Sequence, residues 1–214
     1  MEENEAREKI LKGAEMLFMK YGVRSISMDD IARHLSVSKK TLYQHFTDKD
    51  DMITQISKIH LERNIEEMEM CSNTAANAID ELGKISGCLK KDMEEINPSL
   101  LFDLQKYHPK AWAVWLEFKR RFIKDSVVKN LNKGIEEGHF RPEINVEILA
   151  ALRMQIIEDV FDERIFPKDR FNLAEAQMQI FDHFVYGLCT EKGRKLYQKY
   201  KAESITIETT HSQQ

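Results

Sequence analysis

The chain has 214 residues, of which 42% are hydrophobic and 32% charged, and its 8 glycines and 4 prolines are few, as is typical of a helical globular protein. No apolar run approaches the roughly 18–20 residues of a membrane-spanning helix, and the charged, acidic N-terminus is unlike a signal peptide, so we expect a cytoplasmic protein. The net charge of −4 would argue against a nucleic-acid partner if it were spread evenly, but the charges are distributed unevenly along the chain. Residues 20–49 carry six basic and three acidic residues, a local +3 that leaves −7 for the rest.

The three cysteines, Cys71, Cys88 and Cys189, lie far apart in the sequence and form no CxxC pair. Their odd number suits a reducing compartment, in which we expect incidental thiols rather than a redox switch. The histidines are equally scattered, and His34 and His45 have no partner at metal-ligand spacing. No metal and no cofactor is therefore expected.

The first predicted helix covers residues 5–21, where apolar side chains recur at helical spacing and Gly22 follows as a C-terminal stop. The second begins after Ser27, whose hydroxyl is placed to cap the free N–H groups, and Asp30 stands in the reciprocal position of a capping box. Its apolar residues recur at i, i+3, i+4 and i+7, which predicts a short helix with one buried face.

A brief turn at Ser36 leads to Ser38, the expected N-cap of a third short helix over residues 39–45. Its inward side chains are Leu42 and Phe46, one helical turn apart. A fourth helix follows almost directly. Two short amphipathic helices joined by a tight turn are typical of a helix-turn-helix, in which the second helix offers its polar face to the major groove of DNA.

The remainder of the chain is also predicted to be helical, and it shows no strand pattern and no repeat. Gly138 and Gly193 are expected to end two of the helices, and the polar stretch from residue 202 is expected to be a mobile tail. The predicted helices are residues 75–96, 99–106, 109–137, 146–161 and 173–191.

The polar face of the predicted helix-turn-helix holds the candidate DNA contacts. Backbone phosphates call for hydroxyl and basic groups, whereas base edges call for side chains such as glutamine and lysine on the exposed side of the second helix. The candidate DNA-binding residues are Ser27, Ser38, Lys39, Lys40, Thr41, Tyr43, Gln44, His45 and Lys49.

Residues 27–46, with the following Thr47, Asp48 and Lys49, closely resemble the signature of the TetR family of bacterial regulators, and the match extends over about residues 5–60. The resemblance implies an all-α fold in which an N-terminal three-helix DNA-binding domain with a helix-turn-helix precedes a larger helical domain for effector binding and dimerisation. The corresponding boundaries are 4–64 for the DNA-binding domain, 65–201 for the second domain and 202–214 for the tail.

The resemblance also implies a homodimer whose two recognition helices enter successive major grooves of a near-palindromic duplex operator. Tyr43 and Lys49 match positions that typically grip phosphates, and Lys39 and Thr41 match positions that commonly touch DNA. The chain departs from the family pattern at Ser36, where glycine is frequent, and at Lys40, where a small residue is common. If residue 36 has a positive φ, serine there costs about 1 kcal/mol.

An aromatic-rich stretch and its surroundings supply candidates for a ligand cavity, although ordinary helix packing explains the same pattern. Arg153, Glu158 and Asp159 interrupt an otherwise apolar helix, where any of them would anchor a ligand or take part in a dimer contact. The candidate ligand-binding residues are Phe102, Tyr107, Trp112, Trp115, Phe118, Phe122, Met154 and Phe161.

The last two long predicted helices carry apolar stripes, which serve either the chain's own core or, as the family resemblance implies, a four-helix dimer interface. The stripes are Leu149, Ile156 and Val160 on one helix and Ala176, Ile180, Phe184 and Leu188 on the other.

The sequence shows no nucleophile elbow, phosphate loop, zinc motif or paired acid and base, so no enzymatic activity is expected. The predicted function is that of a sequence-specific transcription regulator, a repressor that a small hydrophobic or amphipathic ligand releases from its operator. Two alternatives remain open at this point: a DNA-binding regulator without a small-molecule effector, either constitutive or controlled by a protein, and a transcription activator.

Overall fold

The computed structural model describes residues 2–167 and 169–211, and helices account for nearly all of its secondary structure. Within these residues the only strand-like pairing is a single bridge between Phe140 and Cys189. The predicted all-α fold is thus confirmed. The helices are α1 (Glu2–Tyr21), α2 (Met28–His34), α3 (Lys39–His45), α4 (Lys49–Thr74), α5 (Ala78–Glu95), α6 (Leu100–Tyr107), α7 (Pro109–Phe118), the π-helical turn η1 (Lys119–Ile123), α8 (Lys124–Glu136), α9 (Val146–Asp159), α10 (Leu173–Leu188) and α11 (Glu191–His211).

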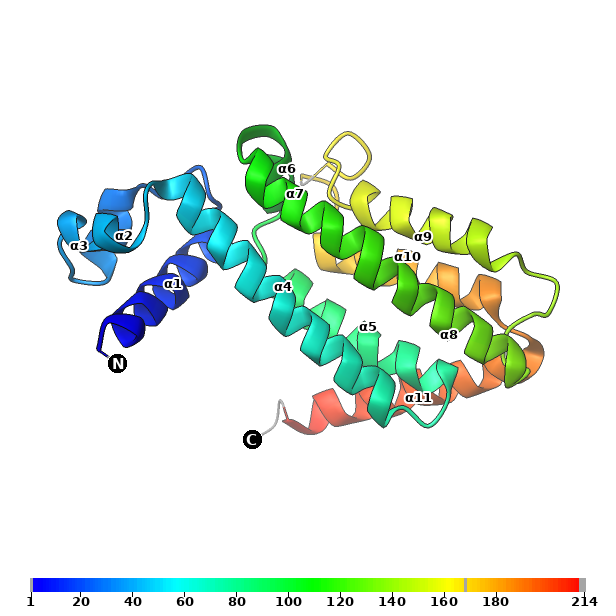
Figure 1. Ribbon diagram of the computed structural model, residues 1–214. Helices are drawn as coiled ribbons and strands as arrows, with labels where there is room; N and C mark the ends of the chain where they lie inside the picture. The colour runs from blue at the N-terminus through cyan, green and yellow to red at the C-terminus, as the bar shows by residue number, and fades with distance from the viewer. Residues whose placement is uncertain (1, 168, 212–214) are drawn as a thin grey trace.

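The helices form two parts that α4 connects (Figure 1). Helices α1, α2 and α3 lie together at one end of the molecule, and α5 to α10 form a larger bundle at the other. Helix α4 has 26 residues, about 39 Å at the usual rise per residue, and runs from the first part deep into the second. The predicted boundary at residues 64 and 65 therefore falls inside one continuous helix, and the division into domains stays a prediction.

The local signals in the first part fold as the sequence predicts. The Ser27 hydroxyl accepts from the Asp30 amide at 3.2 Å, and the Asp30 carboxylate accepts from the Ser27 amide at 3.0 Å, which completes the capping box. Ser38 caps α3 by accepting from the Thr41 amide at 3.0 Å. Between the two helices, Ser36 has a φ of 55°, so this serine adopts the left-handed conformation that glycine takes without strain.

Two features of the second part depart from the predicted elements. The helix expected over residues 109–137 is interrupted by a π-helical turn at Lys119–Ile123, which adds one residue to a turn without breaking the rod. Gly193 does not end a helix: α10 stops at Leu188, and Gly193 lies in the first turn of α11. A Cβ on Gly193 would lie 2.1 Å from the His139 carbonyl oxygen, so close packing requires this glycine.

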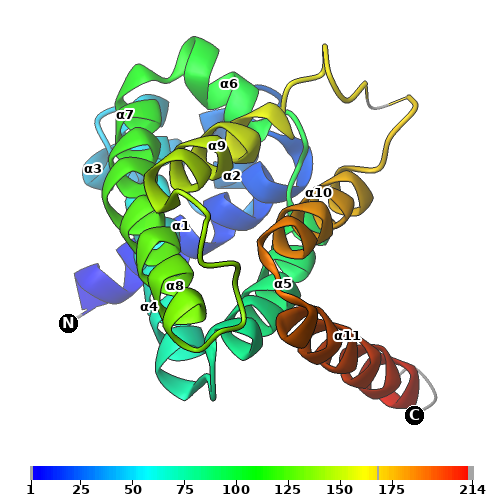
Figure 2. The ribbon, with the colours of Figure 1, turned by 90° about the vertical axis from the view of Figure 1, so that its right-hand side faces the viewer.

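The stretch expected to be a mobile tail continues α11 as far as His211, and residues 212–214 lie outside the described part. Figure 2 shows α11 running outward from the end of the bundle. Gly138, by contrast, follows α8 with a φ of 70° and ends that helix as predicted.

One of three hydrophobic clusters joins the two parts. The buried side chains of α1 to α4, among them Phe18, Leu42 and Phe46, form one cluster with Leu104 of α6 and Ala111 of α7. A second cluster fills the space between α5, α8, α10 and α11, and a third lies between α4, the α7–η1 segment and α9. Helix α6 thus packs against the helix-turn-helix part although it lies more than fifty residues away in sequence.

Candidate DNA interface and ligand cavity

The outward face of α3 is polar and accessible. Lys39, Lys40, Tyr43 and Gln44 are exposed, while Leu42 on the opposite side is fully buried. This arrangement gives a short helix, anchored by its apolar side, that presents two amines, a phenol and an amide to solvent. Such groups suit the phosphates and base edges of a major groove.

The remaining DNA-contact candidates on this part are engaged locally. The hydroxyls of Ser27 and Ser38 serve as helix caps, and Thr41 shares a 2.7 Å hydrogen bond with Ser38. Lys39 forms a 2.8 Å ion pair with Asp29 of α2, and this hydrogen bond raises the pKa of the lysine. His45 is half-buried. Of the contacts named here, the Lys39–Asp29 ion pair joins α3 to α2, and the others cap single helices.

Lys49 occupies a different environment from the other candidates. Its half-buried ammonium donates to the Val23 carbonyl and lies 5.9 Å from the centre of the Phe18 ring. Burial lowers its pKa, although Asp103 and Asp50 act in the opposite direction. The first residue of α4 therefore links the loop between α1 and α2 to the helix that leads into the bundle.

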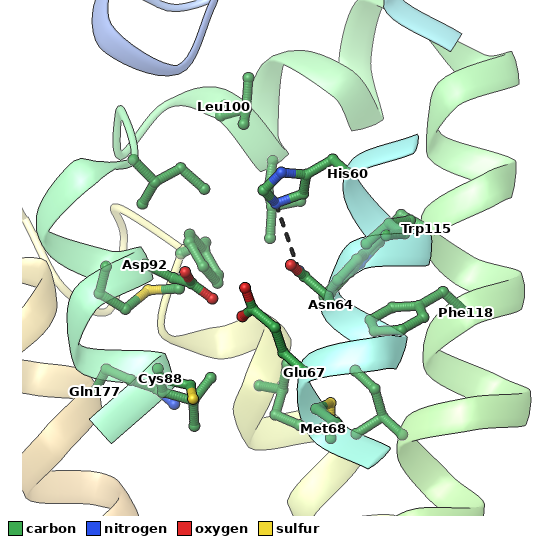
Figure 3. A pocket seen from close by; sticks show the side chains of 18 of the residues that line it. His60, Asn64, Glu67, Met68, Cys88, Asp92, Leu100, Trp115, Phe118 and Gln177 are labelled. Atoms are coloured by element: carbon green, nitrogen blue, oxygen red, sulfur yellow. Dashed lines mark hydrogen bonds between the residues drawn. The ribbon is translucent and has the colours of Figure 1, made fainter. Parts of the chain in front are cut away.

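A cavity of about 220 Å³ lies inside the bundle and is mainly apolar. Its walls come from α1, α4, α5, α6, α7, α8, α9 and α10. Figure 3 shows Trp115 and Phe118 of α7 beside His60 and Asn64 of α4. Glu67 of α4 and Asp92 of α5 also line the cavity. Because so many helices line this cavity, a small molecule bound in it would contact most of the fold.

Three of the eight predicted ligand-binding residues line the cavity: Trp115, Phe118 and Phe161. The others lie elsewhere for separate reasons. Phe102 and Tyr107 are exposed on α6, and Trp112 packs against the core of the helix-turn-helix part. Phe122 stacks on the outer side of Phe118, with ring centres 5.7 Å apart, and Met154 is buried in the same cluster.

The cavity also contains polar residues that the sequence pattern did not single out. His60 pairs with Glu15 of α1 and contacts Asn64 at 3.4 Å, and Arg63, which is not part of the cavity lining, also pairs with Glu15. Gln177 of α10 is 4% exposed. No motif connects these positions in the sequence, since they come from three helices that only the fold brings together.

Cys71 and Cys88, distant in sequence, become neighbours in the cavity wall. Their sulfur atoms lie 3.8 Å apart, on α4 and α5. Burial, together with the neighbouring Cys88, raises the pKa of Cys71 to about 11, so this thiol is a poor nucleophile at neutral pH. Burial likewise raises the pKa of Cys189 to about 11.

Of the three charged candidates on α9, only Arg153 faces the cavity. Glu158 pairs with Lys119, and Asp159 accepts from the Gln155 amide at 2.8 Å. Arg153 is 4% exposed, and its guanidinium carbon lies 5.1 Å from the centre of the Phe181 ring and 5.6 Å from that of Phe184. Desolvation lowers its pKa to about 10.

Helix α6 and its flanking residues connect the cavity to the helix-turn-helix part. The Asn97 amide donates to the Met19 carbonyl at 2.7 Å, at the end of α1, and His108 pairs with Asp50 near the start of α4. The guanidinium of Arg24 lies 4.9 Å from the centre of the Tyr107 ring. Two contacts thus hold the ends of α1 and α4, and a third holds the segment between α1 and α2, all from α6 and the residues that flank it.

The apolar stripes of α9 and α10 are mostly internal. Val160, Ala176 and Leu188 are buried, and the other predicted stripe positions are half-buried. Of the two roles that the sequence left open, the buried positions serve the chain's own core, and a part for the half-buried ones in a dimer interface stays a prediction. The exposed apolar positions of α9 are instead Ile148, at 64%, and Leu152, at 49%.

The described residues hold neither a cluster of metal-ligating side chains nor a membrane-spanning helix. No group of three or more histidine, cysteine or carboxylate side chains in this part of the chain is arranged to hold a metal ion. Nor does any helix among residues 2–167 and 169–211 combine the length and apolar character needed to cross a membrane.

Comparison with known proteins identifies the N-terminal part. Residues 10–56 match the family of bacterial regulatory proteins described as the tetR family. The HTH-type transcriptional regulator YvaF of Bacillus subtilis, itself uncharacterized, is 27% identical over 172 residues, which cover 78% of this chain and 88% of that protein. The HTH-type transcriptional repressor KstR2 of Mycobacterium tuberculosis is 24% identical over 149 residues, 68% of this chain and 74% of the relative.

The fold also matches solved structures over most of its length. A putative transcriptional regulator from Saccharomonospora viridis, solved in complex with choline, superposes with a TM-score of 0.73 at 19% identity and covers 88% of this chain and all of that one. At this identity the likeness concerns the fold. Residues 10–56 thus match the tetR family, and the relatives that cover most of this chain are helix-turn-helix transcriptional regulators.

Proposed function

We propose that the chain is a dimeric repressor that releases its operator when a small molecule fills the cavity. The observation that carries this proposal is that helices of the DNA-binding part form part of the cavity wall. Phe18 and Met19 of α1 and Ile53 of α4 face the same space as α6 and the bundle. A ligand there contacts the helices that position α3.

The mechanism follows from the contacts of α6. This helix lines the cavity through Leu100, Leu101 and Leu104 and holds the ends of α1 and α4 through Asn97 and His108. A ligand that binds one arrangement of α6 more tightly than another shifts the population toward it. Because α1 and α4 move with α6, the two recognition helices of a dimer then lose the spacing that adjacent major grooves require.

The DNA contacts within this proposal divide into two kinds. Tyr43 and Lys49 hold phosphates, Lys49 after exchanging the Val23 carbonyl for a phosphate oxygen, while Lys40 and Gln44 reach base edges from the exposed side of α3. Lys39 and Thr41 contact the backbone nearby. The exposure of Lys40, Tyr43 and Gln44 supports their role, and the half-buried ammonium of Lys49 implies a second, structural one.

The dimer in this proposal uses the outer surface of α9 and α10. Ile148 and Leu152 lie one helical turn apart on α9, and exposed apolar pairs of this kind are typical of surfaces that a second subunit covers. Gly187 is exposed on α10, and a Cβ there would meet nothing within 4 Å, so a second helix can approach closely.

The test is a fluorescence anisotropy titration of the full chain on the DNA upstream of its own gene, at several salt concentrations. We expect sequence-specific binding that weakens steeply as salt rises, because phosphate contacts release counterions. Unrelated DNA of the same length is the control. Equal affinity for both DNAs, or no binding to either, would contradict the proposal.

A further inference from the structure

The buried polar atoms that lack a hydrogen-bond partner point to the chemistry of the ligand. Among the residues that the structure describes, two buried side-chain atoms have none: Nη1 of Arg153 and Nε1 of Trp115. Both are donors, and both residues line the cavity. A buried donor without an acceptor is costly, so a cavity that leaves two of them unsatisfied is incomplete without a group that accepts hydrogen bonds.

We infer that the cavity binds a small amphipathic monocarboxylate, with the carboxylate on Arg153 and Trp115 and the apolar body among Phe118, Phe181 and Phe184. This inference rests on the proposed function, since it names the class of effector for the same cavity. A guanidinium donates two parallel hydrogen bonds to a carboxylate, which gives such a pair both strength and a fixed geometry.

In the part of the chain that the structure describes, the surroundings of Arg153 provide no acidic side chain to pair with it, which favours an anionic ligand as its partner. Its lowered pKa has one cause, desolvation, and among the described residues no carboxylate pairs with it. The phenyl rings of Phe181 and Phe184 contact the cation but do not neutralise it. At 4% exposure the side chain is enclosed by its own chain, which excludes the dimer contact that the sequence left open.

The acidic residues of the cavity do not compete for this role. Glu15 is paired with His60 and Arg63, Asp92 has an interaction of its own, and Glu67 is exposed to solvent. They set a limit on the ligand, because their negative charge disfavours a second anionic group. One guanidinium is balanced by one carboxylate, whereas a phosphate monoester would bring excess negative charge into a mainly apolar space.

The cavity volume limits the size of the apolar body. A cavity of about 150 Å³ holds a benzene molecule. The 220 Å³ here therefore admits a somewhat larger body, such as an unbranched chain of about eight carbons. Octanoate is accordingly a suitable probe, and octan-1-ol and octylamine match its chain length with a neutral and a cationic head.

Isothermal titration calorimetry of the full chain with these three probes tests the inference. We expect octanoate to bind about tenfold or more tightly than octan-1-ol, and octylamine to bind least, because only the carboxylate pairs with the buried cation. Equal binding of octanoate and octan-1-ol, or stronger binding of octylamine, would overturn the inference.

Variants locate the site. Arg153→Met should weaken octanoate binding by about 10- to 100-fold and leave octan-1-ol nearly unchanged, and Trp115→Phe should weaken octanoate by a few-fold. Arg120→Met, which removes an exposed arginine outside the cavity, is the matched control and should bind like the parent chain. Undiminished octanoate binding by Arg153→Met would overturn the assignment of the head group.

Folding does not obscure this test. Arg153→Met removes an unpartnered buried charge and should melt at or above the temperature of the parent chain. If it fails to fold, Arg153→Lys keeps the charge without the planar donors, and its octanoate affinity should lie clearly below that of the parent. Arg153→Lys binding equal to the parent's would then refute the paired geometry.

The calorimetry uses no DNA, so its outcome is separate from that of the proposed function. Loss of operator binding in the absence of any probe would refute the proposed function and leave the octanoate result standing. Tight operator binding combined with no preference for octanoate would refute this inference alone.

Discussion

The face of α3 and the interior cavity handle charge in opposite ways. On α3, Lys39 and Lys40 are exposed to water, and Lys39 has a nearby acid as a partner. In the cavity, Arg153 is withdrawn from water and has no acid beside it. A surface charge stays solvated, so it carries little desolvation cost until a large partner binds. An enclosed charge has already lost its water and is preorganised for a small ligand of opposite charge.

Because one charge is exposed and the other buried, salt should affect binding at the two regions differently. Binding through the lysines of α3 should weaken as ionic strength rises, because exposed charges are screened and counterions are released. Binding at Arg153 should depend less on salt, since buried charges are screened much less than exposed ones. The two regions nevertheless share a core, because Leu104 and Ala111 pack with the helix-turn-helix residues. We propose that one kind of binding affects the other through that shared core.

The largest effect should come from breaking the shared core. Phe46 is 1% exposed, and Phe46→Ala should cost about 3–5 kcal/mol in the free energy of unfolding. Trp112 packs against the same cluster as Phe46, whereas Trp115 lines the cavity, so in a Trp112→Phe background the remaining fluorescence reports unfolding on the cavity side. If the two parts unfold together, urea transitions followed by circular dichroism and by tryptophan fluorescence shift equally.

The exposed Tyr43 on the same helix provides the control, because Tyr43→Ala should change stability by about 0.5 kcal/mol or less. If Phe46→Ala loses helix at a lower urea concentration while the tryptophan transition stays in place, the two parts unfold independently. That result would contradict a core shared between them.

The next effect concerns the proposed contacts of α3 with DNA. Gln44→Ala should cost about 1–3 kcal/mol on the preferred operator and less on operators altered at one position, because it removes contacts to a base. Tyr43→Phe should cost about 1 kcal/mol on all operators alike, because it removes one phosphate contact. Anisotropy titrations against a panel of single-base operator variants measure both, and identical profiles for the two variants would argue against this division.

A smaller effect is expected at the turn between α2 and α3. Ser36 has a φ of 55°, and Ser36→Gly should raise the free energy of unfolding by up to about 1 kcal/mol, because glycine adopts this conformation without a steric penalty. Ser25→Gly, in a turn where φ is not positive, should instead be neutral or slightly destabilising. Thermal melts compare the two, and equal shifts in the same direction would contradict the strain at residue 36.

The smallest effect concerns pH. Burial alone would raise the pKa of Glu15, but hydrogen bonding from His60 and the charge of Arg63 outweigh it, so the pKa lies below 4.5. The stabilisation from a lowered carboxyl pKa is present above the unfolded value and is lost as pH falls through the folded value. Glu15→Gln should therefore reduce stability at pH 7, by about 1 kcal/mol or less, and make it less sensitive to acid. Equal losses at pH 3 and pH 7 would contradict this.

The helix-turn-helix was predictable from the sequence because its determinants are local. The capping box at Ser27, the N-cap at Ser38 and the strain at Ser36 each involve residues within a few positions of one another. The end of α8 at Gly138 was predictable for the same reason. Periodicity also placed most helices within a few residues of their ends.

The cavity was not predictable to the same degree because its walls are assembled from eight helices. The aromatic stretch around Trp115 drew attention to α7, yet Phe102 and Tyr107 of the same stretch point outward. The spacing of an apolar stripe does not reveal which neighbour it packs against, so the sequence left two roles open for Leu188 and Val160, and the fold places both in the chain's own core. Arg153 stood out in the sequence as a charge in an apolar helix, but only the fold showed that it is enclosed.

The coupling between the cavity and α3 is tested most directly by one measurement: the affinity of the full chain for its operator, by anisotropy at fixed salt, with and without octanoate at a concentration that calorimetry shows to be saturating. We expect octanoate to lower the operator affinity by about tenfold or more, and octan-1-ol at the same concentration to have a much smaller effect. An operator affinity that stays the same with the cavity saturated would contradict the coupling of the two regions.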